Sequence, residues 1–232
     1  NFPPYEYIDE NGEPAGYNVD LVRAIADEVG LNIKIQLGPW TEIREKIREG
    51  HMDAIQGIFY SPKRDETLDM SPAHTRIGYV LVTRQGKRLP GNLQDLEGQR
   101  VLVQDGDLME EELVKSGLED EIVATQTQKE ALRLLNNGKY DYALTSRVLA
   151  HFHSEKNGWD NLVIGNQPVY TAEYCLGVLE GNSALLSRLT EGLAAVKATG
   201  QYRQIYSKWL GVYEQPDQTL TDFLRYALYV LV

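Results

Sequence analysis

The stretch from Gln56 to Arg64 holds residues whose types and spacing suit the binding of a small anion. It follows a short apolar run that predicts a buried strand, so Gly57 lies where that strand ends and lets another group approach the backbone closely. Ser61 and the proline after it indicate a turn or a helix start, and Arg64 follows within one helical turn. Its guanidinium can bind a planar carboxylate. The alternative is a surface loop in which Arg64 only pairs with neighbouring acids.

The elements around this stretch alternate between helices and strands. Residues 21–29 carry apolar side chains at three- and four-residue steps, which predicts a helix, and alternation at 32–37 predicts a strand. After a second helix, the strand at 52–58 completes a β-α-β-α-β series, which is typical of a mainly parallel sheet covered by helices. Ligands bind beyond the carboxyl ends of such strands, and both Trp40 and Gly57 follow strands. On spacing alone, Trp40 is a core residue.

A polar segment at 84–92 separates this unit from a second one with the same alternation. There, residues 105–107 read Asp-Gly-Asp and lead into a helix that begins near Leu108. The first turn of this helix carries three consecutive glutamates at 110–112, which we interpret as helix capping and a solvated face. Further strands and helices continue this unit, and a long helix at 184–198 and a last amphipathic helix follow it.

Composition limits the classes of function. The chain has 232 residues, 42% of them hydrophobic, which is enough for a sizeable core in one large domain or two small ones. Its formal net charge of -11 would repel a phosphate backbone, so no nucleic acid is expected as a partner. A local arginine can still hold an anionic ligand inside a cleft. The single cysteine, Cys175, excludes an internal disulfide and is interpreted as a buried, inert thiol.

Motifs for catalysis, metal binding or an organic cofactor were not found in the sequence. The histidines lack the spacing of a metal site on one helix face, and there is no nucleophile elbow, phosphate loop or dinucleotide fingerprint. The residues alone therefore indicate a two-unit α/β protein with a cleft, without a metal or cofactor.

A series of short motifs runs along almost the whole chain, from residue 1 to residue 211. They are Pro3-Pro4-Tyr5-Glu6-Tyr7, Asn11-Gly12, Gly16-Tyr17-Asn18-Val19-Asp20-Leu21, Gly50-x-x-Asp53-Ala54, Ser61-x-x-Arg64, Asp95-Leu96-x-Gly98, Ala131-Leu132-x-Leu134-Leu135 and Gly200-x-Tyr202-x-x-Ile205-Tyr206-x-Lys208-Trp209-Leu210-Gly211. In order and spacing, these motifs resemble the signature of extracytoplasmic solute-binding proteins of family 3.

The resemblance implies a Venus-flytrap fold, in which two α/β lobes joined by two hinge strands enclose a polar small molecule, usually an amino acid. Lobe 1 would be discontinuous, with residues 1–84 plus 175–214, and lobe 2 would span residues 88–171. The hinge strands would be the one that ends near Thr83 and the one through Tyr174. Closure of the lobes around the ligand would then serve signalling or transport.

The resemblance also implies roles for individual residues. Arg64 would clamp the ligand's carboxylate, and Phe2 and Trp40 would flank the ligand as aromatic walls. Gly57 would offer backbone contacts, and Gly106 would offer its N–H from lobe 2. The complete set of expected ligand-binding residues is Phe2, Trp40, Gln56, Gly57, Phe59, Arg64, Gly106, Asp107 and Ser146.

Three departures from the family pattern bear on the ligand. Ser146 stands where amino-acid binders usually carry an acid for the ligand's ammonium. Residues 105–107 replace a common Ser-Gly-Thr, and Ile58-Phe59 follow Gly57 where a small hydroxyl residue is usual. We therefore hypothesise that Asp107 binds a cationic group of the ligand. A ligand with no amino group is the competing hypothesis.

The tail at 215–232 ends in an apolar, aromatic run from Phe223 to Val232. It either leads into a transmembrane helix or docks on the body as an amphipathic helix. Two features favour a receptor's sensor domain: this tail and the abrupt start of the chain. The residues around Trp40 and Gln56 favour it too, because they resemble those of sensor domains of membrane-bound histidine kinases and diguanylate cyclases. We expect it on the periplasmic or extracellular face of a bacterial membrane. Its partners would be an amino acid or other small carboxylate, downstream transmembrane and output domains, and, as an open alternative, a second copy in a homodimer.

Two other functions stay open. A free periplasmic receptor that delivers its solute to an amino-acid importer predicts a gene that ends near residue 232 without a membrane segment. An enzyme similar to the cyclohexadienyl dehydratases, which share this fold, would need a general acid in the cleft. Glu173, beside the hinge, is the only candidate for that acid.

Overall fold

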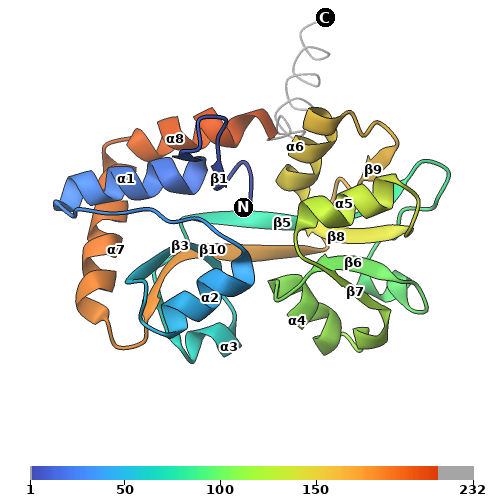
Figure 1. Ribbon diagram of the computed structural model, residues 1–232, viewed down its shortest axis with the longest axis horizontal. Helices are drawn as coiled ribbons and strands as arrows, with labels where there is room; N and C mark the ends of the chain where they lie inside the picture. Colours follow the sequence, from blue (N-terminus) through green and yellow to red (C-terminus); the bar gives the residue numbers. More distant parts are fainter. Residues whose placement is uncertain (1, 214–232) are drawn as a thin grey trace, which may run out of the picture.

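A computed structural model describes residues 2–213 of the chain. Two groups of strands and helices lie side by side, and two long strands run between them (Figure 1). No helix within the described residues is long and apolar enough to cross a bilayer. The tail at 215–232, for which a membrane helix or a docked helix was expected, lies outside the described residues.

The first lobe combines segments from both ends of the described chain. Its long helix α1 (Tyr17–Val29) packs against α7 (Ser183–Ala198), and Gly192 allows this close approach because a Cβ there would lie 2.8 Å from Ile25. The other elements are β1 (Tyr7–Ile8), β2 (Pro14–Ala15), α2 (Trp40–Arg48), β3 (Ala54–Phe59), α3 (Pro62–Asp65), β4 (Leu68–Met70), α8 (Gln201–Trp209) and the 3-10 turn η3 (Gly211–Tyr213).

The second lobe is built around three parallel strands. The central strand β6 (Val101–Gln104) pairs with β7 (Ile122–Thr125) and with β8 (Tyr142–Ser146). Leu102, Leu132 and Ala143 are fully buried in the core between this sheet and its helices. The remaining elements are α4 (Leu108–Lys115), α5 (Gln128–Asn136), α6 (Arg147–Asn157), β9 (Leu162–Ile164) and the 3-10 turns η1 (Leu93–Leu96) and η2 (Glu119–Glu121).

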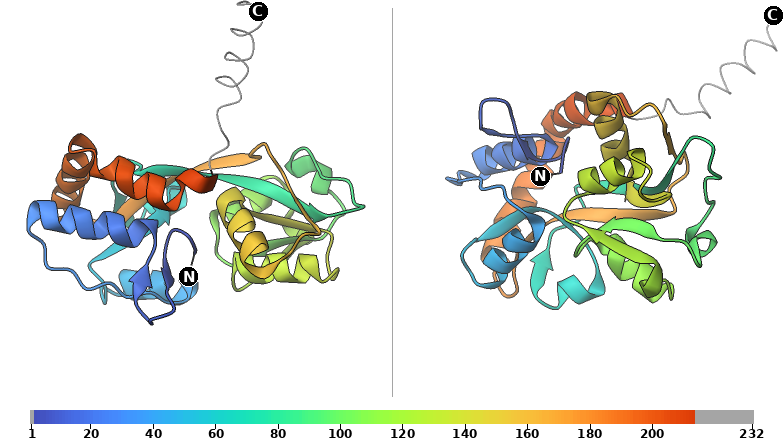
Figure 2. Two further views of the ribbon diagram at one scale, coloured as in Figure 1. Left: turned by 90° about the horizontal axis from the view of Figure 1, so that it is seen from above. Right: turned by 45° about the vertical axis from the view of Figure 1, so that its right-hand side comes forward.

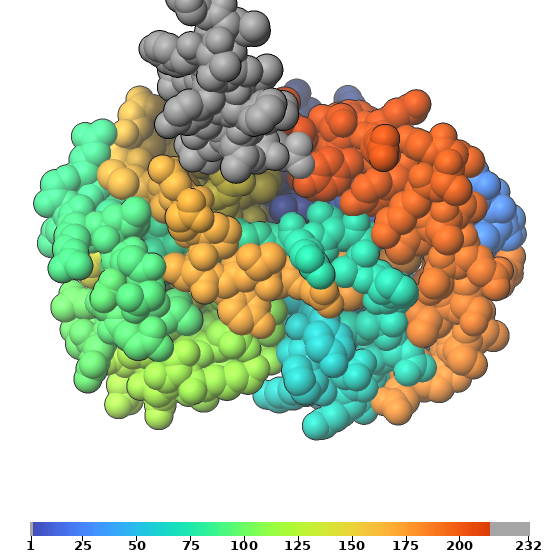
Figure 3. Space-filling view, turned by 180° about the vertical axis from the view of Figure 1, so that it is seen from behind, coloured from blue at the N-terminus to red at the C-terminus, as the bar shows by residue number. Residues whose placement is uncertain are grey.

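Two antiparallel strands connect the lobes. The first half of β5 (Thr75–Arg84) pairs with the first half of β10 (Tyr170–Leu179). Beyond this contact, β5 pairs with β8 and β9 in the second lobe, whereas β10 pairs with β3 and β4 in the first. Figure 2 shows this connection from two further sides, and Figure 3 shows it from behind, where the surfaces of both strands run between the lobes. The two hinge strands expected from the family motifs are thereby confirmed.

The sheet is mixed, and one expected strand is not formed. Residues 31–39 have no regular secondary structure, and no backbone hydrogen bond joins 32–38 to the rest of the described chain. The strand predicted at 32–37 is therefore wrong. Alternating apolar residues form a strand only where a neighbouring edge takes up their backbone groups. Here residues of this segment and of β3 line the same cavity, and no backbone hydrogen bond joins them. The exact lobe boundaries, 1–84 plus 175–214 and 88–171, stay a prediction.

Candidate functional site

A cavity of about 1390 Å³ has walls from both lobes. The first lobe contributes β3 and the segment before α2, and the second lobe contributes the residues that follow β6 and β7. Gly106 and Ser146 do not line this cavity, although both were expected at the site. The other seven expected residues line it: Phe2, Trp40, Gln56, Gly57, Phe59, Arg64 and Asp107.

Arg64 is positioned by a short capped helix, as its local sequence predicted. Ser61 is the N-cap of α3, its hydroxyl accepts a hydrogen bond from the Arg64 N–H, and Pro62 occupies the first helical position. The Arg64 side chain is 5% exposed, and its guanidinium carbon lies 5.6 Å from the centre of the Trp40 ring. At this distance the indole ring attracts the cation. Trp40 therefore forms a wall of the cavity, whereas its spacing had favoured a core position.

Glu111 on α4 makes an ion pair with Arg64 across the two lobes. Nε and Nη2 of Arg64 each lie 3.1 Å from Oε1 of Glu111. The hydroxyl of Ser61 donates to the other carboxylate oxygen at 3.1 Å. The interpretation of all three glutamates of this helix as capping or solvated residues is thus wrong for Glu111. Local sequence could not indicate this contact, because the partners are 47 residues apart and lie on different lobes.

The backbone carbonyl of Gly106 is a second point of contact between the lobes. It accepts hydrogen bonds from Trp40 Nε1 at 3.0 Å, from Arg64 Nη2 at 3.2 Å and from Arg44 Nη1 at 3.3 Å. Burial, together with the neighbouring Arg64, lowers the pKa of Arg44. The N–H of Gly106, expected to face the ligand, instead donates to the Glu110 carboxylate at 2.6 Å. In this structure Gly106 therefore contributes its carbonyl to the contact between the lobes.

Asp107 is the N-cap of α4 and a junction of buried polar groups. Its carboxylate accepts hydrogen bonds from the Met109 N–H, the Tyr79 hydroxyl and the Gln128 amide, each at 3.0 Å. The residue is 6% exposed, and burial raises the pKa of its carboxyl. Three donors already engage this carboxylate.

Ser146, also expected at the site, is fully buried, and its N–H donates to Gln128 Oε1 at 2.8 Å.

Glu6 is a site residue that sequence reasoning missed. It lines the cavity and is only partly buried. Its carboxylate accepts hydrogen bonds from the Tyr174 hydroxyl at 3.1 Å and from the side-chain amide of Asn18. Burial raises the pKa of the Glu6 carboxyl. Glu6 belongs to the Pro3–Tyr7 motif, but nothing in that motif's spacing pointed to a cleft.

Aromatic rings cluster around Tyr174, whose hydroxyl binds the Glu6 carboxylate. The ring of Phe59 lies 4.6 Å from that of Tyr174 and 6.2 Å from that of Phe2, measured between centroids. Gly57 makes room for this arrangement, because a Cβ there would lie 2.3 Å from the Tyr174 hydroxyl and 2.4 Å from the Asn18 amide. The glycine is therefore required by the packing of its neighbours as well as by its place on the cavity wall.

Glu173, the only acid considered for the enzymatic alternative, does not line the cavity. Its carboxylate lies 2.9 Å from Arg76, and the two side chains are 48% and 70% exposed. The carboxyl groups that do line the cavity near the hinge are those of Glu6 and Asp107.

Residues 1–212 match the family model of the bacterial extracellular solute-binding proteins, family 3. The chain belongs to this family. It is 39% identical to a crystallised histidine kinase sensor domain with similarity to periplasmic binding proteins, over 90% of this chain and 92% of that one, with a TM-score of 0.88. This likeness confirms the two-lobed solute-binding fold.

Two curated relatives of this chain belong to different classes of protein, a binding protein and a sensor. A probable histidine-binding protein from Neisseria gonorrhoeae is 25% identical over 217 residues, which cover 90% of this chain and 79% of that protein. The virulence sensor protein BvgS from Bordetella pertussis is 24% identical over 213 residues, which cover 90% of this chain but only 17% of that much longer protein. Family 3 domains thus occur among both binding proteins and sensors.

Proposed function

We propose that this chain is the ligand-binding sensor domain of a signal-transducing receptor on the extracytoplasmic face of a bacterial membrane. The observation that carries the proposal is the 39% identity to a histidine kinase sensor domain over nine tenths of both chains. The ligand is a small polar solute, an amino acid or a related carboxylate, and the lobes close around it. Rotation about β5 and β10 then transmits binding to the rest of the receptor.

The cavity supports a ligand with both a carboxylate and an amino group. Arg64 supplies a buried guanidinium suited to a planar carboxylate. Glu6 supplies the acid for the amino group, because it lines the cavity as a partly exposed residue, whereas Asp107 is buried. Asp107 remains a second acceptor for a cationic group, beside its role as a helix cap. Phe2, Trp40 and Phe59 form apolar walls around the ligand.

A thermal-shift screen of amino acids, polyamines and small carboxylates tests ligand binding. A ligand at 100 times its dissociation constant stabilises the folded chain by about 2.7 kcal/mol, which gives a clear rise in melting temperature. Isothermal titration then measures the affinity of each hit. A screen in which no compound raises the melting temperature would contradict the proposed ligand class.

Cell fractionation separates the sensor from the alternative of an importer's free receptor, which the similarity to the histidine-binding protein favours. The tagged product of the full-length gene is expressed in its host and followed through osmotic shock and membrane preparation. We expect it in the membrane fraction, with a kinase or cyclase activity that changes when the ligand is added. Release of the protein by osmotic shock would support the importer.

A further inference from the structure

The guanidinium of Arg64 is already occupied by groups of the protein itself. Nε and Nη2 donate to Glu111, Nη2 also donates to the carbonyl of Gly106, and Nη1 donates to the carbonyl of Phe59 at 3.4 Å. Four of its five N–H groups therefore have acceptors within the chain. A ligand carboxylate that approaches Arg64 meets a guanidinium that already binds a carboxylate.

The carboxylate of Glu111 binds the opposite lobe through both oxygens. Arg64 takes Oε1, and the Ser61 hydroxyl takes Oε2. The two charged side chains are 5% and 16% exposed, so solvent and salt screen this ion pair less than an exposed one. The pair also has charge-assisted hydrogen bonds from Nε and Nη2, which are stronger than neutral ones.

The carbonyl of Gly106 adds to the same contact. Trp40 and Arg44 on α2 donate to it, next to the Arg64 donor from α3. One end of α4 and the residue before its cap are thus held against two helices of the first lobe. Every group in this contact belongs to the chain, so the contact between the lobes needs no ligand to complete it.

We propose that Glu111 is a built-in occupant of the carboxylate-binding position on Arg64. It holds the lobes together in the ligand-free protein, and a ligand carboxylate binds Arg64 only by displacing it. Because Glu111 is part of the chain, its effective concentration at Arg64 is on the order of millimolar, which a free ligand must overcome. The displacement step rests on the proposed function, whereas closure by Glu111 does not.

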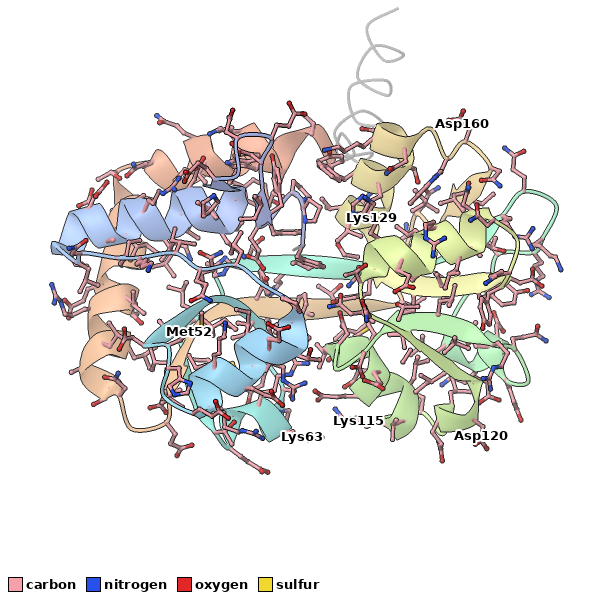
Figure 4. The ribbon with its side chains drawn as sticks, in the orientation of Figure 1. Met52, Lys63, Lys115, Asp120, Lys129 and Asp160 are labelled. Atoms are coloured by element: carbon pink, nitrogen blue, oxygen red, sulfur yellow. The ribbon has the colours of Figure 1, made fainter. Side chains whose placement is uncertain are left out.

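Distance measurements between the lobes test closure. Lys63 on α3 and Lys115 on α4 are labelled on the two sides of the gap between the lobes in Figure 4, and both side chains are exposed. Spin labels on Lys63→Cys and Lys115→Cys report their separation by pulsed electron resonance, while the native Cys175 is buried and escapes labelling. In the doubly labelled protein without ligand, we expect a single short distance between the two spin labels.

When Glu111→Gln is added to the doubly labelled protein, most molecules should show a longer distance between the spin labels, because the charge that binds Arg64 is lost. Glu111→Asp, which keeps the charge but shortens the reach, should do the same. The control is Glu119→Gln, which removes an equal charge from an exposed position. Melting temperatures verify that each variant is folded. Distances for both Glu111 variants that match the control would overturn the proposal.

L-Histidine and histamine, which differ in the carboxylate, test displacement. Glu111→Gln should bind L-histidine roughly tenfold or more tightly than the unmodified chain, since one competing charged hydrogen-bonding group is gone. Histamine has no carboxylate to compete with Glu111, so its affinity should not show this gain. Equal L-histidine affinities would overturn displacement by the ligand. If neither protein binds L-histidine or any other amino acid, the proposed ligand class is wrong, and the distances without ligand still decide the role of Glu111.

Discussion

The hydroxyl of Tyr79 on the hinge strand β5 lies 3.0 Å from the carboxylate of Asp107, the N-cap of α4. The same carboxylate binds the Gln128 amide at the start of α5. Asp107 therefore links the strand that joins the lobes to two helices of the second lobe. This relationship predicts that Asp107 contributes to stability independently of any ligand.

Asp107→Ala should lower the free energy of unfolding by roughly 2–4 kcal/mol. The helix loses its cap, and the buried hydroxyl and amide lose their acceptor. Urea denaturation measures this loss, with Asp105→Ala as the exposed neighbouring control. Asp107→Asn, which keeps one acceptor oxygen, then isolates the charge. A fall in ligand affinity for Asp107→Asn would support binding of a cationic group, and unchanged affinity for every ligand would remove that hypothesis.

Glu6→Gln should weaken binding of an amino-acid ligand by roughly 10- to 150-fold, which corresponds to about 1.5–3 kcal/mol for a hydrogen bond to a charged group. Isothermal titration with an amino acid and with its hydroxy-acid analogue separates the ammonium contact from the rest. The variant should bind the hydroxy acid nearly as well as the unmodified chain does. Glu10→Gln, at an exposed position between β1 and β2, is the control. Equal losses for both ligands would contradict the assigned role.

Gly57→Ala should destabilise the chain by about 1–3 kcal/mol and reduce ligand affinity. The added Cβ displaces the Tyr174 hydroxyl, which otherwise donates to Glu6. Gly91→Ala is a suitable control, because the nearest atom to its added Cβ is a side-chain oxygen 3.5 Å away. Denaturation and titration on both variants test the effect. A Gly57→Ala variant as stable and as active in binding as Gly91→Ala would show that Tyr174 moves without cost.

Two buried histidines should make the chain less stable in mild acid. Burial lowers the pKa of His74 to about 3 and that of His153 to about 4, from an ordinary value of 6.5. Below pH 6.5 the unfolded chain takes up protons that the folded chain does not. Each histidine therefore removes about 1.4 kcal/mol of stability per pH unit as the pH falls toward its lowered pKa.

Urea denaturation at pH 7, 6 and 5 measures this slope. The raised carboxyl pKa values of Glu6 and Asp107 act in the opposite sense, since these groups gain protons on folding. Comparison with His153→Gln cancels them and should show a smaller loss of stability in acid. His51→Gln, which replaces a ring that is 69% exposed, is the control. An unchanged slope in His153→Gln would contradict the prediction.

Local sequence signals predicted the surroundings of Arg64 well. Ser61 and Pro62 begin α3 as their types indicated. Gly57 lies beside the cavity, but the prediction that the strand ends at this glycine is wrong, because β3 continues to Phe59. These features depend on residues a few positions apart, where turn chemistry and capping act directly. The alternation of helices and strands also predicted two units, and the family motifs added the hinge strands that join them.

Contacts between distant segments could not be predicted in the same way. Glu111 has the spacing of a solvated residue on α4, and only the position of the opposite lobe turns it into a partner of Arg64. Residues 32–37 alternate like a strand, but pairing depends on whether an edge is close enough, which the alternation does not reveal. Glu6 shows the same limit, because its partner Tyr174 lies 168 residues away.

The pairing of β5 with β10 makes the second lobe an insertion within a β-hairpin. The chain leaves the first lobe along one strand and returns along its immediate neighbour, so a single continuous segment holds the whole second lobe. Chimeras that exchange this segment between relatives need only two junctions, both on adjacent strands. Recombination can therefore exchange the wall of the binding cavity that the second lobe supplies. The first lobe, which holds both ends of the described chain, stays unchanged.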